Sequence, residues 1–188
     1  GTSCTDSGLS ANTQYTYTMT AWNSSGTSPT GPGTAKYTLA NSPTAASYSG
    51  TQTSLTANIN ANGNPSGTNY QFQLKNSGGT VIQGPTAWGT SRSYTFTGLT
   101  AGTTYSAEAK ARNGNNIETG WVNLGTATTV PGNVTVTGSN GALSWSTAGR
   151  GYVTLSWPAV TAATGYKLHV FDGNAFREFD LGNVTSWD

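Results

Sequence analysis

The sequence has very few groups that could carry out chemistry. Only 8% of its 188 residues are charged, its formal net charge is +1, and it contains one histidine and one cysteine. This balance gives neither the basic surface that binds nucleic acid nor the polybasic segment that binds a membrane. A lone Cys4 excludes an internal disulfide and a multi-cysteine metal site. We therefore expect no nucleic-acid partner, no membrane insertion, no metal and no cofactor.

Long apolar runs and catalytic motifs are absent as well. No segment is long and apolar enough to span a bilayer, and no charged segment followed by an apolar one indicates a signal peptide. Neither a phosphate-binding loop nor a nucleophile elbow occurs. Because the chain begins at Gly1 without a methionine, we expect it to be a mature or excised part of a longer protein. The sequence predicts no enzyme.

The nearest approach to a catalytic pair is Glu178 and Asp180, two positions apart in a predicted strand. That spacing would place their carboxylates about 6–7 Å apart. Inverting glycosidases hold two carboxylates roughly 6.5–9.5 Å apart, but across a sugar-binding cleft. His169 falls on the outward phase of its own strand and has no second histidine or cysteine partner. We interpret all three side chains as solvent-exposed.

Aromatic and small polar residues are what the sequence has in abundance. Aromatic residues make up 11% of the chain, with six tryptophans and nine tyrosines, and threonine, serine, asparagine and glycine are frequent. Aromatic residues and threonine favour strands, and glycine, asparagine and serine favour tight turns. An ordered, short-stranded all-β fold is therefore expected.

One segment repeats along the chain. In residues 103–112, apolar and polar residues alternate, which predicts a strand with one buried face. Leu99 and the turn before Tyr105 predict a corner between two sheets, where a tyrosine ring is buried and its hydroxyl bonds to upstream backbone. The same corner occurs 90 positions earlier, at Leu9 and Tyr15. Because 90 residues is the size of one β-sandwich, the chain is predicted to be an array of modules.

The repeated segment reads Gly-Leu, a short turn, Thr-x-Tyr, alternation to alanine and a final Asn-Gly or Asn-Ser. It resembles the corner and sixth strand of a fibronectin type III domain. The resemblance implies tandem immunoglobulin-like β-sandwiches, one complete and two partial. Residues 43–130 would be a complete module. Residues 1–40 would be the C-terminal half (strands E to G) of a separate module, and residues 131–188 the N-terminal half (strands A to C′) of another. The last part also resembles modules of wall-associated Rhs-type proteins of Gram-positive bacteria.

Strand positions follow from the alternation and the turn residues. In the complete module we expect seven strands, at residues 43–48, 54–60, 69–75, 81–82, 93–97, 103–112 and 121–129. In the first part we expect strands at residues 2–5, 14–22 and 34–39, with a loop over 23–33. In the last part we expect them at residues 131–137, 152–158, 165–170 and 176–181.

The candidate core and contact residues fall into two groups. The resemblance implies core or corner positions for Leu9, Tyr15, Tyr70, Leu99, Tyr105, Trp157 and Tyr166. The others are candidates for glycan or partner contact, because they lie on an outward phase or in or near loops: Trp22, Trp88, Trp121 and Trp145. Exposed tryptophan can stack on a sugar ring or anchor a partner, but it can also be buried between successive modules.

The two partial modules lead to a functional hypothesis. Each would leave an apolar face and an unpaired strand edge in water. Residues 131–188 of one chain could complete residues 1–40 of the next, and such a head-to-tail contact yields an open fibre. The other explanation is that the chain was cut from a longer run of modules. Which of the two holds is left open by the sequence.

We predict a non-enzymatic, extracellular structural or spacer array associated with a bacterial cell surface. Its expected partners are other copies of itself or adjacent modules, together with cell-wall or extracellular polysaccharide. The alternative function is a carbohydrate-binding accessory region of a secreted polysaccharide-degrading enzyme.

Overall fold

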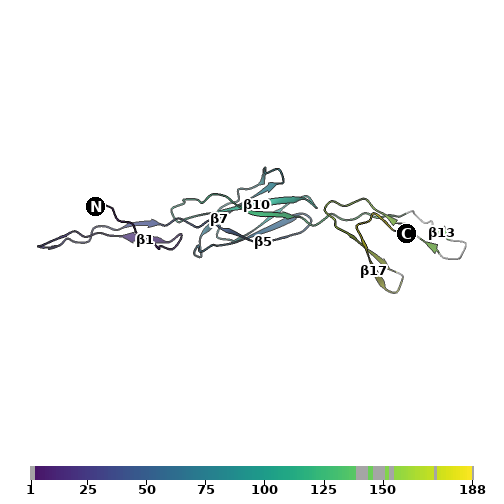
Figure 1. The fold of residues 1–188 in the computed structure, drawn as a ribbon, viewed down its shortest axis with the longest axis horizontal. Coiled ribbons are helices and arrows are strands. Elements are labelled where there is room, and N and C mark those ends of the chain that lie inside the picture. Colours follow the sequence, from purple (N-terminus) through teal and green to yellow (C-terminus); the bar gives the residue numbers. More distant parts are fainter. Residues whose placement is uncertain (1–2, 139–143, 146–150, 153–154, 172, 188) are drawn as a thin grey trace. The chain divides into compact units, whose positions relative to one another are not determined.

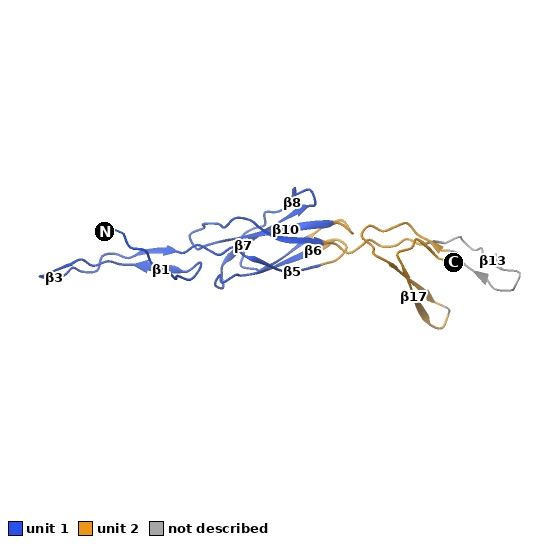
Figure 2. Ribbon diagram, in the orientation of Figure 1, with its two compact units in different colours: residues 1–49, 55–96, 104–127 blue, residues 50–54, 97–103, 128–188 orange. Residues whose placement is uncertain are grey.

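The computed structural model describes residues 3–138, 144–145, 151–152, 155–171 and 173–187. All regular secondary structure among these residues is β-strand. The described residues contain no helix, and therefore no helix long and apolar enough to cross a bilayer. The predicted all-β fold is confirmed. Two compact units are present (Figure 2): residues 1–49, 55–96 and 104–127 form unit 1, and residues 50–54, 97–103 and 128–188 form unit 2. The division into three modules stays a prediction.

The middle of the chain is an immunoglobulin-like β-sandwich. It contains the seven predicted strands, whose ends differ from the predicted ones by no more than two residues: β5 (Thr44–Gly50), β6 (Ser54–Asn60), β7 (Asn69–Asn76), β8 (Val81–Gln83), β9 (Ser93–Thr97), β10 (Thr104–Arg112) and β11 (Val122–Thr128). They form a three-stranded sheet, β5-β6-β9, and a four-stranded sheet, β11-β10-β7-β8 (Figure 1).

The core of this sandwich follows from alternation along its strands. On β7, the side chains of Phe72 and Leu74 are 3% and 0% exposed. They lie opposite Ala109 and Ala107 of β10, both fully buried, in an antiparallel register. Large residues on β7 are thus matched by small residues on β10, which allows close packing without a cavity.

The hydroxyl of Tyr70 is an exception in this core. It is buried, and it makes no hydrogen bond of good geometry, although the side chains of Asn64 and Thr68 lie close to it. Because an unpaired buried hydroxyl is unfavourable, we predict that Tyr70→Phe raises the free energy of unfolding by about 1 kcal/mol. Urea unfolding measures this. Tyr48→Phe is the matched control: the Tyr48 hydroxyl donates to the Gly125 carbonyl at 3.0 Å, so its loss should lower stability. A destabilised Tyr70→Phe protein would contradict the prediction.

Residues 1–40 contain one long hairpin. Strand β1 (Gln14–Tyr17) pairs with β4 (Thr34–Tyr37), and β2 (Trp22–Asn23) pairs with β3 (Gly26–Thr27). The backbone between them continues the pairing, because Gly31 N donates to Met19 O at 3.0 Å. Two predictions were wrong here. Residues 3–5 form no strand, since no described strand pairs with them, and the predicted loop over 23–33 contains β3.

The first tyrosine corner forms only in part. Ser10 N donates to the Tyr15 hydroxyl at 3.1 Å, as predicted. The Tyr15 ring, however, is only half-buried, whereas Tyr105 at the second corner is 5% exposed. The expected core position of Tyr15 is therefore corrected: β1 belongs to a two-stranded sheet, and no second described sheet covers it as one covers β10.

Side chains tie this hairpin to loops of the sandwich within unit 1. Asn12 Nδ2 donates to Thr68 Oγ1 at 2.8 Å, and Asn12 Oδ1 accepts from Gly114 N at 2.9 Å. Tyr37 N donates to Asn115 Oδ1, also at 2.9 Å. Asn12 has a positive φ of 43°, a conformation that asparagine tolerates. One turn residue therefore links the hairpin to two loops.

Gly114 is the tightest point of this junction. A Cβ at this position would overlap the ring of Tyr37. We predict that Gly114→Ala displaces the ring, lowers stability by about 1–3 kcal/mol and makes the hairpin easier to cleave by limited proteolysis. Gly120→Ala is the control, because a Cβ there meets no atom within 4 Å. Equal cleavage of both variants would show that the junction does not depend on this contact.

Residues 131–188 fold within unit 2 into small sheets. One has the order β12 (Thr137–Gly138), β15 (Leu155–Ser156) and β18 (Ser186–Trp187). The others are the pairs β16 (Tyr166–Phe171) with β17 (Phe176–Gly182), and β13 (Ser144–Trp145) with β14 (Gly151–Tyr152).

The core of this part contains the predicted pair Trp157 and Tyr166. They are 6% and 7% exposed, and their ring centroids lie 5.6 Å apart. The strand predicted over residues 131–137 is corrected: residues 131–136 form no strand, because β12 pairs with β15 at only two positions. Strand β18 was not predicted; its Trp187 lies opposite Leu155.

Candidate functional site

Comparison with the strand order of the complete sandwich shows which strand pairings are missing from the described residues of the two outer parts. In the sandwich, β7 is paired on both edges, with β8 and with β10. In residues 131–188, β16 occupies the place of β7 but pairs only with β17 among the described residues. The hairpin of β1 and β4 occupies the place of β10 and β11, 90 positions earlier. One part thus presents a free sheet edge, and the other presents the type of hairpin that covers such an edge.

The hairpin exposes apolar side chains that its repeat buries. Met19 is 83% exposed and Tyr17 is 45% exposed. The equivalent residues of the complete sandwich, Ala109 and Ala107, are fully buried. Methionine is among the most frequently buried residue types, and one so exposed beside an unpaired strand edge marks a candidate interface.

The free edge of β16 borders an apolar groove in unit 2. The groove has a volume of about 200 Å³, and its lining includes Val134, Val136, Trp157, Leu168 and Leu181. The two valines are 42% and 49% exposed. The indole Nε1 of Trp157 is buried and has no acceptor in the described residues. This groove could therefore accept further apolar side chains.

Two of the candidate tryptophans lie together on the outer face of β10. Lys110 Nζ is 5.3 Å from the centroid of Trp88 and 4.7 Å from that of Trp121, and Arg112 Cζ is 4.5 Å from Trp88. Both rings are half-buried. Cations over a ring face stabilise the structure and compete with a sugar for the same face. The sequence did not reveal this cluster, because alternation orients Lys110 but does not show which loop covers it.

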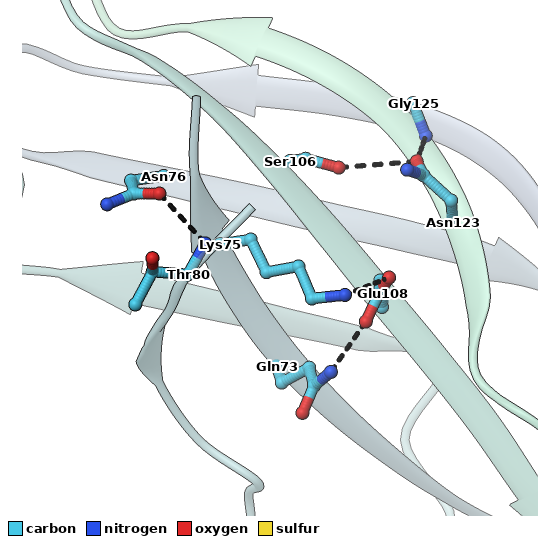
Figure 3. Close-up of polar contacts among 8 residues, drawn as sticks. All are labelled: Gln73, Lys75, Asn76, Thr80, Ser106, Glu108, Asn123 and Gly125. Atoms are coloured by element: carbon cyan, nitrogen blue, oxygen red, sulfur yellow. Dashed lines mark hydrogen bonds and ion pairs between the residues drawn. The ribbon is translucent and has the colours of Figure 1, made fainter. Parts of the chain in front are cut away.

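Beside this cluster lies a buried polar network (Figure 3). Glu108 is 8% exposed, although alternation predicted a solvated charge; neighbouring polar side chains of β7 pack against it. It accepts hydrogen bonds from Gln73 Nε2 and, at 2.6 Å, from Lys75 Nζ. Burial alone would raise the pKa of Glu108. The hydrogen bonds from Lys75 and Gln73 and the charge of Lys75 outweigh burial and hold this pKa below its ordinary value of 4.5.

The remaining predicted site residues lie in separate parts of the structure. Trp22 is 82% exposed in β2, and the side chain of Trp145 lies outside the described residues. Leu9 is half-buried, and Tyr70 and Leu99 are buried. Sequence reasoning missed an exposed aromatic pair at the tip of the β16–β17 hairpin: Phe171 and Phe176 are 57% and 74% exposed, with ring centroids 4.8 Å apart.

The acidic pair on β17 is solvent-exposed, as predicted. Glu178 accepts a hydrogen bond from Lys167 Nζ at 2.6 Å and lies 3.6 Å from His169 Nε2. The hydrogen bond from Lys167 is the main reason why the pKa of Glu178 is lowered. Cys4 is free and exposed. No group of three potential metal ligands occurs within the described parts of the chain.

Comparisons with known proteins find short or distant similarities. No protein-family model matches the chain. It is 62% identical over 37 residues to tRNA nuclease WapA of Bacillus subtilis (strain 168) and to tRNA(Glu)-specific nuclease WapA of Bacillus subtilis subsp. natto. Each match covers 20% of this chain and only 2% of the length of the relative.

Two solved structures are similar at low identity. A two-domain fibronectin type III segment of chicken tenascin has a TM-score of 0.41 and 19% identity, over 78% of this chain and 81% of that one. The FN1–FN3 domains of chicken CNTN1 have a TM-score of 0.34 and 17% identity, over 66% of this chain and 45% of that one.

Proposed function

We propose that the chain is a non-enzymatic structural or spacer array, secreted and associated with a bacterial cell surface. Within this array, the hairpin of residues 1–40 of one copy completes the open sheet of residues 131–188 of the next. One observation supports this most strongly: the free edge of β16 and the uncovered hairpin of β1 and β4 correspond to two elements that are paired in the complete sandwich.

The energetics favour such a contact. Fully burying a large apolar side chain contributes about 1.5–3 kcal/mol. Met19 and Tyr17 on the hairpin, and Val134 and Val136 at the groove, are all at least 42% exposed. Pairing β1 with β16 would also satisfy backbone groups that a free strand edge leaves to water. Because the two contact surfaces differ, each copy can bind one neighbour at each end, which gives a linear chain.

Sedimentation velocity of the 188-residue chain over a range of concentrations tests this proposal. The average mass should rise with concentration, and electron microscopy should show filaments. High salt should change the association little, because the expected contact is apolar and made through backbone hydrogen bonds. A chain that stays monomeric at every concentration would contradict assembly, and only the spacer role would then remain.

A second candidate function is a carbohydrate-binding accessory region, and the exposure of Trp22 favours it. A tryptophan that is 82% exposed can stack on a sugar ring. Binding on a glycan array that disappears in Trp22→Ala or Trp121→Ala would support this function. Because Lys110 lies over the ring of Trp121, we expect Trp22→Ala to have the larger effect. We propose no nuclease activity, since the matched segment is 2% of those proteins.

A further inference from the structure

We infer that the segment from Tyr17, the last residue of β1, to Ala21 in one copy pairs antiparallel with β16 of the next copy in one register, which places Met19 opposite Leu168. This inference rests on the proposed function, since it specifies the contact through which copies would join. It adds which strands meet, which residues face each other, and why this hairpin suits β16 rather than β7.

The register follows from the complete sandwich. There, Ala111 of β10 lies opposite Tyr70, the first inward residue of β7. On the hairpin, the residue 90 positions before Ala111 is Ala21. The first inward residue of β16 is Tyr166, which is buried as Tyr70 is. Placing Ala21 opposite Tyr166 transfers the observed register to the contact between copies.

Two further pairs follow from this alignment along the strands. Met19 takes the place of Ala109 and faces Leu168, and Tyr17 takes the place of Ala107 and faces Val170. Leu168 and Val170 are half-buried, and they alternate with exposed residues of β16. Their phase is therefore the inward one, as the register requires.

The residues of the inferred contact differ in size from those of the complete sandwich. In the complete sandwich, Phe72 lies opposite Ala109 and Leu74 lies opposite Ala107. In the inferred contact, Met19 faces Leu168, which has nearly the same volume, and Tyr17 faces the smaller Val170. The hairpin therefore has large residues where β10 has alanine, and β16 has smaller residues than β7 at both positions.

The smaller residues of β16 leave more room for the hairpin than β7 does. Met19 against a phenylalanine such as Phe72 would overfill the layer, which typically costs about 1–3 kcal/mol. Leu168 and Val170 are smaller than Phe72 and Leu74, the residues at the same places in β7. The hairpin of residues 1–40 is therefore better suited to β16 than to β7.

The polar phase of the two strands imposes no electrostatic penalty in this register. Thr18 and Thr20 of the hairpin would face His169 and Lys167. Both basic side chains are more than half exposed and interact with Glu178 of β17, so neither would become an unpaired buried cation. The hydroxyl of Tyr17 donates to Asp6 Oδ2 at 3.1 Å, so the one carboxylate bonded to the contact residues of the hairpin keeps a hydrogen-bond donor. Only the side chains on the inward phase of the two strands would be removed from water by the contact.

Site-directed cross-linking tests the register in the full chain. A Met19→Cys chain is mixed with an isotope-labelled Leu168→Cys chain, both in a Cys4→Ser background, and oxidised. Mass spectrometry should identify a disulfide between positions 19 and 168 of different copies. The control pairs Met19→Cys with Lys167→Cys, on the opposite phase of β16, and should give roughly one tenth of the product or less, because adjacent strand residues point to opposite faces.

The outcomes separate the register from the proposed function. If sedimentation shows assembly but the 19–168 product is no more abundant than the control, the register is wrong and assembly stands. If the cysteine variants and the unsubstituted chain all remain monomeric, both the register and the assembly are wrong. Circular dichroism and urea unfolding of each variant verify that it folds, and Val170→Cys with Tyr17→Cys provides a second pair for the same register.

Discussion

Met19→Asp is expected to abolish self-association of the chain while leaving its fold intact. Met19 is 83% exposed in the single copy, so the substitution should cost little there. In the assembled state it would bury a carboxylate against Leu168, with no partner. Burying an unpaired charge is strongly unfavourable, so we expect association to weaken at least about 100-fold, or about 2.8 kcal/mol. Sedimentation velocity at matched concentrations measures the loss.

Thr18→Asp is the matched control for this prediction. It introduces the same charge one residue away, on the phase that stays in solvent and faces His169 in the inferred register. Its association should match that of the unsubstituted chain within about threefold, since exposed charges near such a contact contribute little. Equal assembly of the Met19→Asp and Thr18→Asp chains would exclude β1 from the contact.

Glu108→Ala is expected to be the most destabilising substitution on the outer face of the complete sandwich. Removing this carboxylate leaves Lys75 Nζ and Gln73 Nε2 without their acceptor. Breaking a buried, hydrogen-bonded pair by removing one partner is costly, and we expect a loss of about 3 kcal/mol in the free energy of unfolding. Glu118→Ala is the control. Glu118 also pairs with a lysine, Lys110, but is 44% exposed, so its loss should cost less than about 1 kcal/mol.

The same network makes stability depend on pH. The pKa of Glu108 is lower in the folded state than its ordinary value of 4.5, so the folded state binds the proton less tightly than the unfolded state. Its contribution is therefore fully present above pH 4.5 and is lost as the pH falls through the lowered folded pKa. The free energy of unfolding, measured in urea, should fall less between neutral and acidic pH in Glu108→Ala than in the unsubstituted chain. Equal losses would contradict this role of Glu108.

The strands of the complete sandwich were predictable because their signals are local. Alternation at period two and flanking glycine, asparagine and proline residues set the limits of a strand within a few positions. The ends of β6 and β9, at residues 54–60 and 93–97, agree with the prediction in full. Burial of Tyr105 agrees with the same phase, and burial of Tyr166 and Trp157 agrees with what the resemblance implied.

What the sequence did not reveal depends on contacts between distant segments. Trp88 and Trp121 belong to loops, and nothing local indicates that both pack around Lys110. Burial of Glu108 depends on Lys75 and Gln73, which are more than 30 positions away. Alternation gives the phase of a side chain along a strand but not what covers that face.

Mixing two chains that are each blocked at one end tests the central claim most directly. Met19→Asp blocks the hairpin, and Leu168→Asp blocks the edge of β16. Each variant alone should remain monomeric, and an equimolar mixture should form a dimer of one copy each and nothing larger, because only one pair of intact surfaces remains. Urea unfolding confirms beforehand that both variants fold. If two folded variants stay monomeric when mixed at concentrations where the unsubstituted chain assembles, head-to-tail completion of the sandwich is wrong.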